Sequence, residues 1–318
     1  MKVIITGASG FIGSHLARFV ANREHDVYAI VRPGSDSWRI EDLRASGVVR
    51  IIECDLCESG RLTSLLDGVA PDLCVHLAWN PTPGNDLDGH GNIASLTASI
   101  ALLDVLAKIG CRRVAIAGTC TEYDTDLGYL SEDSPTKPRT LYAATKLALH
   151  LVTQRYAQLG RFESIWLRFF YLYGAYEERR RLVPSVILSL LRGEPPRLTG
   201  GDQVKDYLHV EDVVSAVWAV ATSNLTGVVN VGSGRPVAVR EVATRIAEHV
   251  GRPDLLRFGS LPYARHDPMF VCSNNARLIS HTTWKPRVDL DAGLAQTIEW
   301  WKSQLTGGRP PDNPTRPA

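Results

Sequence analysis

The chain has 318 residues, of which 44% are hydrophobic and 22% charged, a composition typical of a globular protein with a substantial core. Its 35 basic and 34 acidic residues nearly balance, which gives no electrostatic basis for binding nucleic acid or an anionic membrane. We expect neither a membrane span nor a secretory leader, because no apolar run approaches ~20 residues and the N-terminus lacks a signal-peptide pattern.

Strand-like apolar runs alternate with helical patterns from residue 1 to about residue 168. Such alternation predicts an α/β fold, a doubly wound parallel sheet of the Rossmann type with helices on both faces. The predicted strands cover 2–6, 26–31, 48–53, 72–77, 112–118 and 163–168. The predicted helices cover 11–22, 60–67, 92–109 and 140–159. The helix 92–109 carries more apolar positions than one core-facing stripe needs, which favours a homodimer in which it and the helix 140–159 pair with their copies.

The pattern changes after residue 169, which predicts a second, smaller C-terminal domain. We assign 1–168 to an NAD(P)-binding domain, to which 205–230 return, and 169–204 with 231–304 to the second domain. The proline-rich segment 305–318 is predicted to be a disordered tail. Later predicted elements are a helix between residues 181 and 193, helices at 210–222, 238–250 and 291–304, and a strand at 227–231.

A glycine-rich turn, Gly7-Ala8-Ser9-Gly10-Phe11-Ile12-Gly13, lies between the first predicted strand and the first predicted helix. Backbone N–H groups at the start of such a helix hold a dinucleotide pyrophosphate. The alternative is a glycine-rich turn without a ligand, and the strand–turn–helix context argues against it. The predicted cofactor contacts in this turn are Gly7, Gly10, Phe11, Ile12 and Gly13.

The end of the second strand distinguishes NAD from NADP. An acidic residue there would bind the adenosine ribose 2′-OH, but this chain has Arg32, whose guanidinium matches a 2′-phosphate. Ser35 can add a donor. In the alternative, Arg32 is a solvated surface residue and Asp36 is the ribose acid. We favour NADP(H), and NAD(H) stays open.

Residues after the third and fourth strands complete the predicted cofactor site. Asp55 and Leu56 follow the third strand, where a carboxylate can meet the adenine amino group. Leu77, Ala78 and Trp79 follow the fourth strand, where the backbone would pass under the central ribose.

Thr119, Tyr142 and Lys146 form the predicted catalytic group. Tyr142 and Lys146 are four residues apart in a helix and share one face. Hydride delivered to a ketone leaves an alkoxide that needs a proton, and a nearby ammonium would lower the pKa of a phenol toward that task. Thr119, at the end of the fifth strand, can donate a hydrogen bond to the same oxygen. These three residues therefore predict hydride transfer at a carbonyl carbon.

Together the motifs resemble the extended short-chain dehydrogenase/reductase family, from residue 1 to about 302. The matching segments are Gly7-x-x-Gly10-x-x-Gly13, Asp55-Leu56, His76-Leu77-Ala78, Thr119, Tyr142-x-x-x-Lys146, Arg168-Phe169-Phe170-Tyr171-Leu172-Tyr173-Gly174 and Asp206-Tyr207-Leu208-His209-Val210-Glu211-Asp212. The resemblance implies an NAD(P)-dependent nucleotide-sugar epimerase, dehydratase or 4-ketoreductase. It also implies that the small C-terminal domain holds the nucleotide-diphosphate sugar.

The residues after Thr119 bear on the reaction. Related sugar 4,6-dehydratases carry an Asp-Glu pair there, whereas this chain has Cys120 and Thr121, so dehydration lacks its acid and base. The 3,5-epimerising reductases place a cysteine at the position of Thr121, so a catalytic Cys120 is not expected. Simple hydride exchange at C4 of the sugar remains.

Arg32 favours NADPH-dependent reduction of the C4 keto group of a nucleotide-linked 4-keto-6-deoxyhexose, with Tyr142 as general acid. The Gly-Thr-Cys-x-Glu-Tyr string also resembles such reductases. The alternative is an NAD-dependent nucleotide-sugar 4-epimerase. A non-catalytic NAD(P)-sensing regulator is disfavoured, because such proteins tend to lose the Tyr and Lys that are present here.

Substrate contacts follow from the resemblance. The predicted residues are Asn80, Thr121, Tyr171, Lys205 and Arg265. Tyr171 stands where many relatives have an asparagine, and Lys205 stands in place of a diphosphate-binding arginine.

The six cysteines show no spacing typical of disulfides, so we expect reduced thiols and a cytoplasmic protein. Cys54 and Cys57 match C-x-x-C, but no second pair completes a metal site, and no metal is expected.

Overall fold

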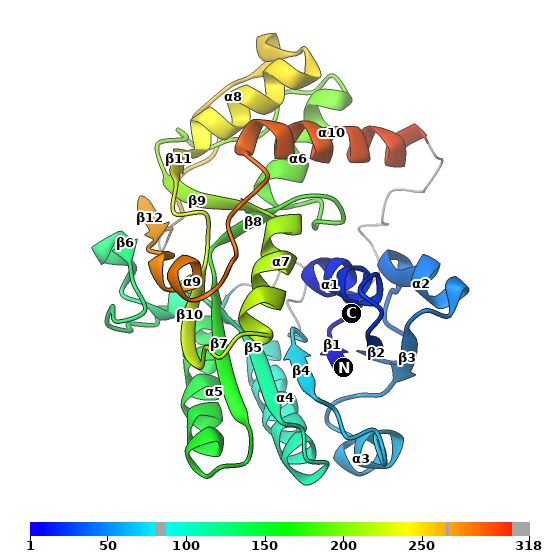
Figure 1. The fold of residues 1–318 in the computed structure, drawn as a ribbon. Helices are drawn as coiled ribbons and strands as arrows, with labels where there is room; N and C mark the ends of the chain where they lie inside the picture. The colour runs from blue at the N-terminus through cyan, green and yellow to red at the C-terminus, as the bar shows by residue number, and fades with distance from the viewer. Residues whose placement is uncertain (80–86, 265–266, 307–318) are drawn as a thin grey trace.

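The fold is a twisted parallel sheet with helices on both faces and a second group of helices and short strands at one end (Figure 1). A computed structural model describes residues 1–79, 87–264 and 267–306. The predicted α/β class with a Rossmann-type sheet is confirmed.

Seven parallel strands form the first sheet, in the order β10-β7-β5-β4-β1-β2-β3. All six strands predicted before residue 169 are in this sheet, and the predicted strand at 227–231 is its seventh member. The strands are β1 (Lys2–Thr6), β2 (Asp26–Val31), β3 (Arg50–Glu53), β4 (Leu73–His76), β5 (Arg113–Thr119), β7 (Glu163–Phe169) and β10 (Gly227–Val231).

The helices match the predicted ones within a few residues, and two short ones, α2 and α9, were not predicted. They are α1 (Phe11–Ala21), α2 (Glu41–Ser46), α3 (Ser59–Leu65), α4 (Gly91–Lys108), α5 (Leu141–Gln158), α6 (Leu182–Leu191), α7 (Val210–Ala221), α8 (Val239–Val250), α9 (Ala276–His281) and α10 (Leu290–Thr306). Short 3₁₀ helices are η1 (Trp38–Ile40), η2 (Cys120–Glu122), η3 (Thr125–Leu127) and η4 (Pro253–Leu255).

Both faces of the sheet are buried, which explains its continuous apolar strands. In β1, Val3 and Ile5 belong to one core cluster with α1 and α7, whereas Ile4 belongs to another with α3, α4 and α5. Neighbouring residues of a strand point to opposite faces, so a strand covered on both sides needs apolar residues at every position.

The second sheet has five short strands, in the order β11-β9-β12-β6, with β8 paired to β9. They are β6 (Tyr129–Leu130), β8 (Tyr171–Tyr173), β9 (Val204–His209), β11 (Pro236–Ala238) and β12 (Phe270–Ser273). None of them was predicted. Beside this sheet, α6, α8 and α10 share a separate apolar cluster (Figure 1).

The segment 205–230, predicted to return to the first domain, is divided between the two sheets. Residues up to His209 lie in β9 of the second sheet, whereas α7 packs against α1 and β10 pairs with β7. Helix α10 extends to Thr306, two residues into the segment predicted as a tail, and the remainder, 307–318, lies outside the described residues. The division into two domains stays a prediction.

Helix α4 is long and apolar enough to cross a membrane by length and composition alone. Its buried residues include Leu102, Leu103 and Leu106, which join the core cluster beneath the sheet. The helix also packs against α5. It therefore serves as a core helix of this fold.

Candidate active site

The glycine turn brings β1, α1 and the end of β4 into close backbone contact. Gly7 has φ +67°, and a Cβ there would lie 2.7 Å from the Ala78 nitrogen. A Cβ on Gly13 would collide with the Gly7 carbonyl oxygen, and Gly10 donates its N–H to that oxygen at 2.9 Å. These glycines are required because three backbone segments meet here without room for side chains.

The same turn fits a dinucleotide pyrophosphate. Helix α1 begins after Gly10, and no side chain within the described ranges caps this end by a hydrogen bond. The first N–H groups of a helix have no partner within the helix, and in α1 they include those of Phe11 and Ile12. An anion there would satisfy them, as in other strand–turn–helix nucleotide sites.

The end of β2 places Arg32 and Ser35 together. Arg32 is exposed, and the Ser35 hydroxyl donates to the Arg32 carbonyl oxygen at 2.7 Å. Asp36 accepts the Trp38 N–H at 3.2 Å, so the alternative ribose acid is partly engaged in its own turn. Two exposed groups of opposite charge, Arg32 and Asp36, therefore follow β2.

The predicted adenine and ribose contacts also lie at strand ends. Asp55 is half-buried and accepts the Cys57 N–H at 2.9 Å, and Leu56 packs on the core. Leu77 and Ala78 follow β4 directly beside the glycine turn, as the Gly7 contact requires.

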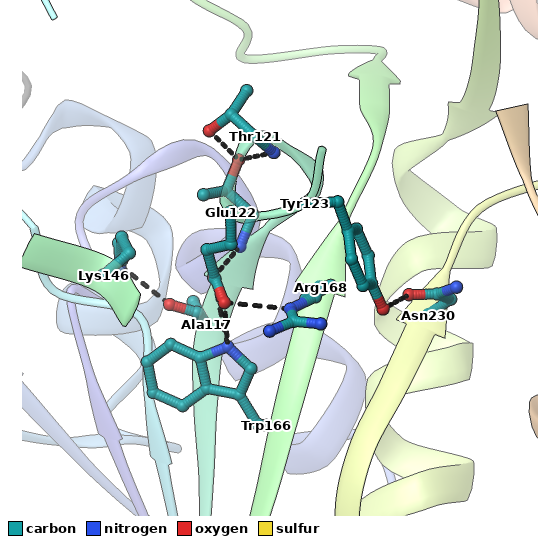
Figure 2. Close-up of polar contacts among 9 residues, drawn as sticks. Ala117, Thr121, Glu122, Tyr123, Lys146, Trp166, Arg168 and Asn230 are labelled. Atoms are coloured by element: carbon teal, nitrogen blue, oxygen red, sulfur yellow. Dashed lines mark hydrogen bonds and ion pairs between the residues drawn. The ribbon is translucent and has the colours of Figure 1, made fainter. Parts of the chain in front are cut away.

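Thr119, Tyr142 and Lys146 are brought together at the carboxyl end of β5 and the start of α5. Thr119 ends β5, and its hydroxyl lies 3.0 Å from the Thr121 hydroxyl. Lys146 is 3% exposed and donates to the Ala117 carbonyl oxygen at 2.7 Å (Figure 2). Its Nζ also lies 3.8 Å from the centre of the Trp79 ring. The buried ammonium is thus held by one carbonyl and one aromatic face.

The pKa of Tyr142 is raised and that of Lys146 is lowered, so both shifts favour the uncharged form. Burial raises the pKa of Tyr142 to about 12, and the Glu122 carboxylate adds to this, while a hydrogen bond with Thr119 opposes it. Burial lowers the pKa of Lys146 to about 7. The expected lowering of the Tyr142 pKa is therefore not found in the protein alone, because burial outweighs the hydrogen bond with Thr119 and the attraction of Arg181.

Neither residue after Thr119 offers an acid or base. Burial raises the pKa of the Cys120 thiol to about 12, so it is not a thiolate near neutral pH. The Thr121 N–H and hydroxyl both contact the Thr119 hydroxyl oxygen. Thr121 therefore supports the geometry of Thr119 at the place where a substrate oxygen is expected.

Sequence reasoning missed a buried carboxylate beside the predicted catalytic group. Glu122 accepts the Thr119 N–H at 2.7 Å and forms an ion pair with Arg168 of β7 at 2.9 Å (Figure 2). The sequence carries a signal for it: Thr119-x-x-Glu122 is a capping box, and both of its hydrogen bonds are present at η2.

Of the predicted substrate residues, Tyr171 and Lys205 contact each other, whereas two others lie outside the described residues. Tyr171, half-buried in β8, lies over the Lys205 ammonium, whose Nζ is 4.9 Å from the ring centre. Lys205 is itself buried and ion-paired with Asp267 at 2.6 Å, so its charge is already balanced within the protein. Asn80 and Arg265 lie outside the described residues.

One residue of the basic run 179–181 reaches the site. Arg181 is exposed at the start of α6, yet its positive charge lowers the pKa of Tyr142. The same charge opposes the rise in the pKa of buried Glu177. Arg181 therefore acts electrostatically on both Tyr142 and Glu177 from the residue that precedes α6.

Aromatic side chains join the loop after β2 to the last helix. The Trp38 ring lies 5.3 Å from Tyr176 and 6.3 Å from Trp300, and Tyr176 lies 5.0 Å from Trp300. Arg39 donates to the Tyr176 carbonyl oxygen at 2.8 Å. The predicted adenosine side of the site is therefore tied to the C-terminal helix group.

Comparison with known proteins identifies the family. A model described as "NAD dependent epimerase/dehydratase family" matches residues 3–232, and the chain belongs to this family. A UDP-glucose 4-epimerase of Mycolicibacterium smegmatis is 28% identical over 96% of this chain and 99% of its own length. A probable UDP-glucuronate 4-epimerase of Rhizobium meliloti is 25% identical over 95% of this chain and 97% of its own.

A solved structure agrees with this assignment. MoeE5 in complex with UDP-glucuronic acid and NAD is 31% identical, with a TM-score of 0.83, and covers 96% of this chain and 100% of that one. The resemblance stated from the motifs is therefore confirmed at the level of the family.

Proposed function

We propose that this chain is a nucleotide-sugar 4-epimerase that oxidises C4 of a UDP-linked hexose and reduces it from the opposite face. The carrying observation is that Thr119, Tyr142 and Lys146 meet at one strand end beside the Glu122 carboxylate, which is buried and ion-paired with Arg168. The relatives named 4-epimerases, which align over nearly the whole chain, support this reaction over the predicted reduction.

Each catalytic side chain has a distinct role in this proposal. When bound, NAD(P) supplies the hydride acceptor and donor for C4. Tyr142 takes the proton of the C4 hydroxyl and returns it, while Thr119 donates a hydrogen bond to the same oxygen. The positive charge of Lys146, together with that of an oxidised nicotinamide ring, would favour the phenolate form of Tyr142.

Sugar 4,6-dehydration is not supported by this arrangement. That reaction needs an acid for the departing hydroxyl and a base for the C5 proton. The Cys120 thiol stays protonated, the Thr121 hydroxyl is hydrogen-bonded to that of Thr119, and the Glu122 carboxylate forms an ion pair with Arg168. None of the three is therefore placed to act as that acid or base.

A second candidate is the NADPH-dependent 4-ketoreductase predicted from the sequence. Exposed Arg32 at the end of β2 favours it, because a guanidinium suits a 2′-phosphate.

The homodimer stays part of both proposals, supported by the exposed apolar side chains Ile93 on α4 and Leu151 on α5. The cytoplasmic location likewise stays a prediction.

The two candidates are separated by cofactor balance. Purified protein is offered UDP-glucose and UDP-glucuronate without added cofactor, and the products are resolved by chromatography. The epimerase proposal expects the C4 epimer with no lasting change in nicotinamide absorbance, and release of bound NAD on denaturation. Loss of NADPH in step with consumption of a 4-keto sugar, with no epimer formed, would favour the reductase instead.

A further inference from the structure

The Glu122 carboxylate lies at the centre of a buried polar network. The side chain is 0% exposed, and the Trp166 indole N–H contacts both of its oxygens, at 2.9 and 3.1 Å. Together with the bonds to Thr119 and Arg168, this gives the carboxylate donors from the backbone of β5 and from two side chains of β7 (Figure 2). A buried carboxylate is stable only with such complete pairing.

Neighbouring positions are shaped around this carboxylate. A Cβ on Gly118 would lie 2.7 Å from the Glu122 Oε1 atom, so glycine is needed for the carboxylate to sit there. The Arg168 guanidinium lies 4.0 Å from the centre of the Tyr123 ring. The Tyr123 hydroxyl in turn donates to Asn230 at 2.8 Å. The network thus runs from the catalytic threonine through β7 to β10.

We propose that Glu122 is a positioning residue of this active site: its carboxylate fixes the backbone of Thr119 and places a negative charge at the same end of β5 where the Ala117 carbonyl holds the Lys146 ammonium. This rests on the proposed function, because the reaction needs Tyr142 beside a charged Lys146. Glu122 does not touch the substrate in this account; it acts through the residues that do.

The charges around the site support this role. Burial lowers the pKa of Lys146, and Glu122 is the group that opposes this. Glu122 also raises the pKa of Tyr142, as does Cys120, while Arg181 lowers it. Burial raises the pKa of Glu122 itself, and Arg168, the Thr119 N–H and the Trp166 indole oppose this rise by favouring the charged form. Without the carboxylate, the pKa values of Lys146 and Tyr142 should both fall.

The direct test is a titration of Lys146 that needs no substrate. Protein labelled with ¹³C at lysine Cε is titrated by NMR, and the Lys146 signal is assigned by its loss in Lys146→Arg. The midpoint in the parent protein is expected near 7. In Glu122→Gln it is expected to fall by about one pH unit. An unchanged or higher midpoint would overturn the proposal.

A matched control and a second variant keep the test decisive. Glu132→Gln removes a carboxylate that accepts the Asn230 N–H at 2.9 Å, at the far end of the same network, and should leave the Lys146 midpoint unchanged. Should Glu122→Gln not fold because Arg168 is left unpaired, the double variant Glu122→Val with Arg168→Met removes both charges, and it is expected to fold with a lowered midpoint.

Turnover separates this proposal from the proposed function. If the parent protein converts nucleotide sugars, the pH profile of kcat should move to lower pH in Glu122→Gln and stay in place in Glu132→Gln. A purely structural Glu122 would lower kcat without moving the profile. If the parent shows no turnover yet the NMR midpoint falls, the electrostatic role stands and the proposed function fails.

Discussion

Two turns at the carboxyl edge of the first sheet, one after β1 and one after β5, use side chains in opposite ways. The turn after β1 has no side chains where Gly7 and Gly13 bring backbones together, whereas the turn after β5 buries the charged pair of Glu122 and Arg168. In the first turn, no side chain of the described residues caps the start of α1; in the second, the Glu122 carboxylate accepts the N–H of Thr119. The turn after β1 is therefore suited to binding an anion, and the turn after β5 is suited to positioning Thr119.

Gly13 and Glu122 also differ in where their partners come from, although Gly7 of the first turn meets the distant Ala78. The contact that excludes a side chain at Gly13 comes from Gly7, six positions earlier in the chain. The Glu122 carboxylate is bonded by Trp166 and Arg168, which are 44 and 46 residues away. The glycine turn should therefore fail by local collision, and the Glu122 turn by loss of a distant partner.

The largest effect is expected where the second turn supports chemistry. Tyr142→Phe removes the proton donor, and kcat should fall by about 10²–10⁴-fold, the usual contribution of a general acid or base. Stability should change little, and the rate of epimer formation measures the effect. Tyr156→Phe is the matched control, because that hydroxyl lies on the same helix and bonds Asp104. A Tyr142→Phe protein with parental kcat would remove Tyr142 from the mechanism.

The buried pair should be far more sensitive than an exposed one. Glu122→Ala leaves the Arg168 guanidinium buried without its partner, which should lower the free energy of unfolding by about 3–5 kcal/mol. Glu241→Ala, which breaks the exposed pair with Arg245, should cost no more than about 1 kcal/mol. Urea unfolding measures both, and equal losses would show that the network after β5 carries no special weight.

The glycine turn should respond to a single added methyl group. Gly13→Ala places a Cβ against the Gly7 carbonyl, so we expect a loss of about 1–3 kcal/mol in stability together with weaker cofactor binding. Gly60→Ala is the control, because this glycine lies in α3 with nothing within 4 Å of the added carbon. It should be neutral or stabilise by about 0.5–1 kcal/mol. The two variants are compared by thermal unfolding and by NAD titration.

The smallest effect concerns pH. The pKa of Lys146 falls from 10.5 to about 7 on folding, so between these values the unfolded chain binds a proton that the folded chain does not. The Lys146 contribution to the free energy of unfolding should therefore rise with pH, by at most about 1.4 kcal/mol per pH unit. The difference between the parent and Lys146→Met, measured from about pH 7 to about pH 8.5, should show this slope. A flat difference would mean that Lys146 keeps its ordinary pKa.

The parts of the molecule that sequence could predict are those encoded locally. Alternating apolar strands and helices identify the first sheet, and the spacing of Gly7, Gly10 and Gly13 identifies its first turn. Tyr142 and Lys146 share a helical face because they are four apart. Periodicity is enough for these features, since the partners lie within one element or one turn.

The parts that sequence missed depend on distant partners. The strands of the second sheet have two to six residues and pair across long connections, as β8 does with β9. Lys205 resembles a free phosphate ligand in the sequence, but folding brings Asp267 to its ammonium. The pKa of Tyr142 could not be predicted from its distance to Lys146 along the helix, because burial dominates it.

The central claim, that hydride leaves C4 and returns to it, is tested most directly by isotope retention. UDP-glucose deuterated at C4 is incubated with the protein in ordinary water, and the epimer is analysed by NMR. The account predicts that deuterium stays at C4 of the epimer, because the hydride does not exchange with water. It also predicts slower turnover, because the covalent bond between C4 and deuterium is broken in the reaction. Epimer that has lost its deuterium to water would contradict the account.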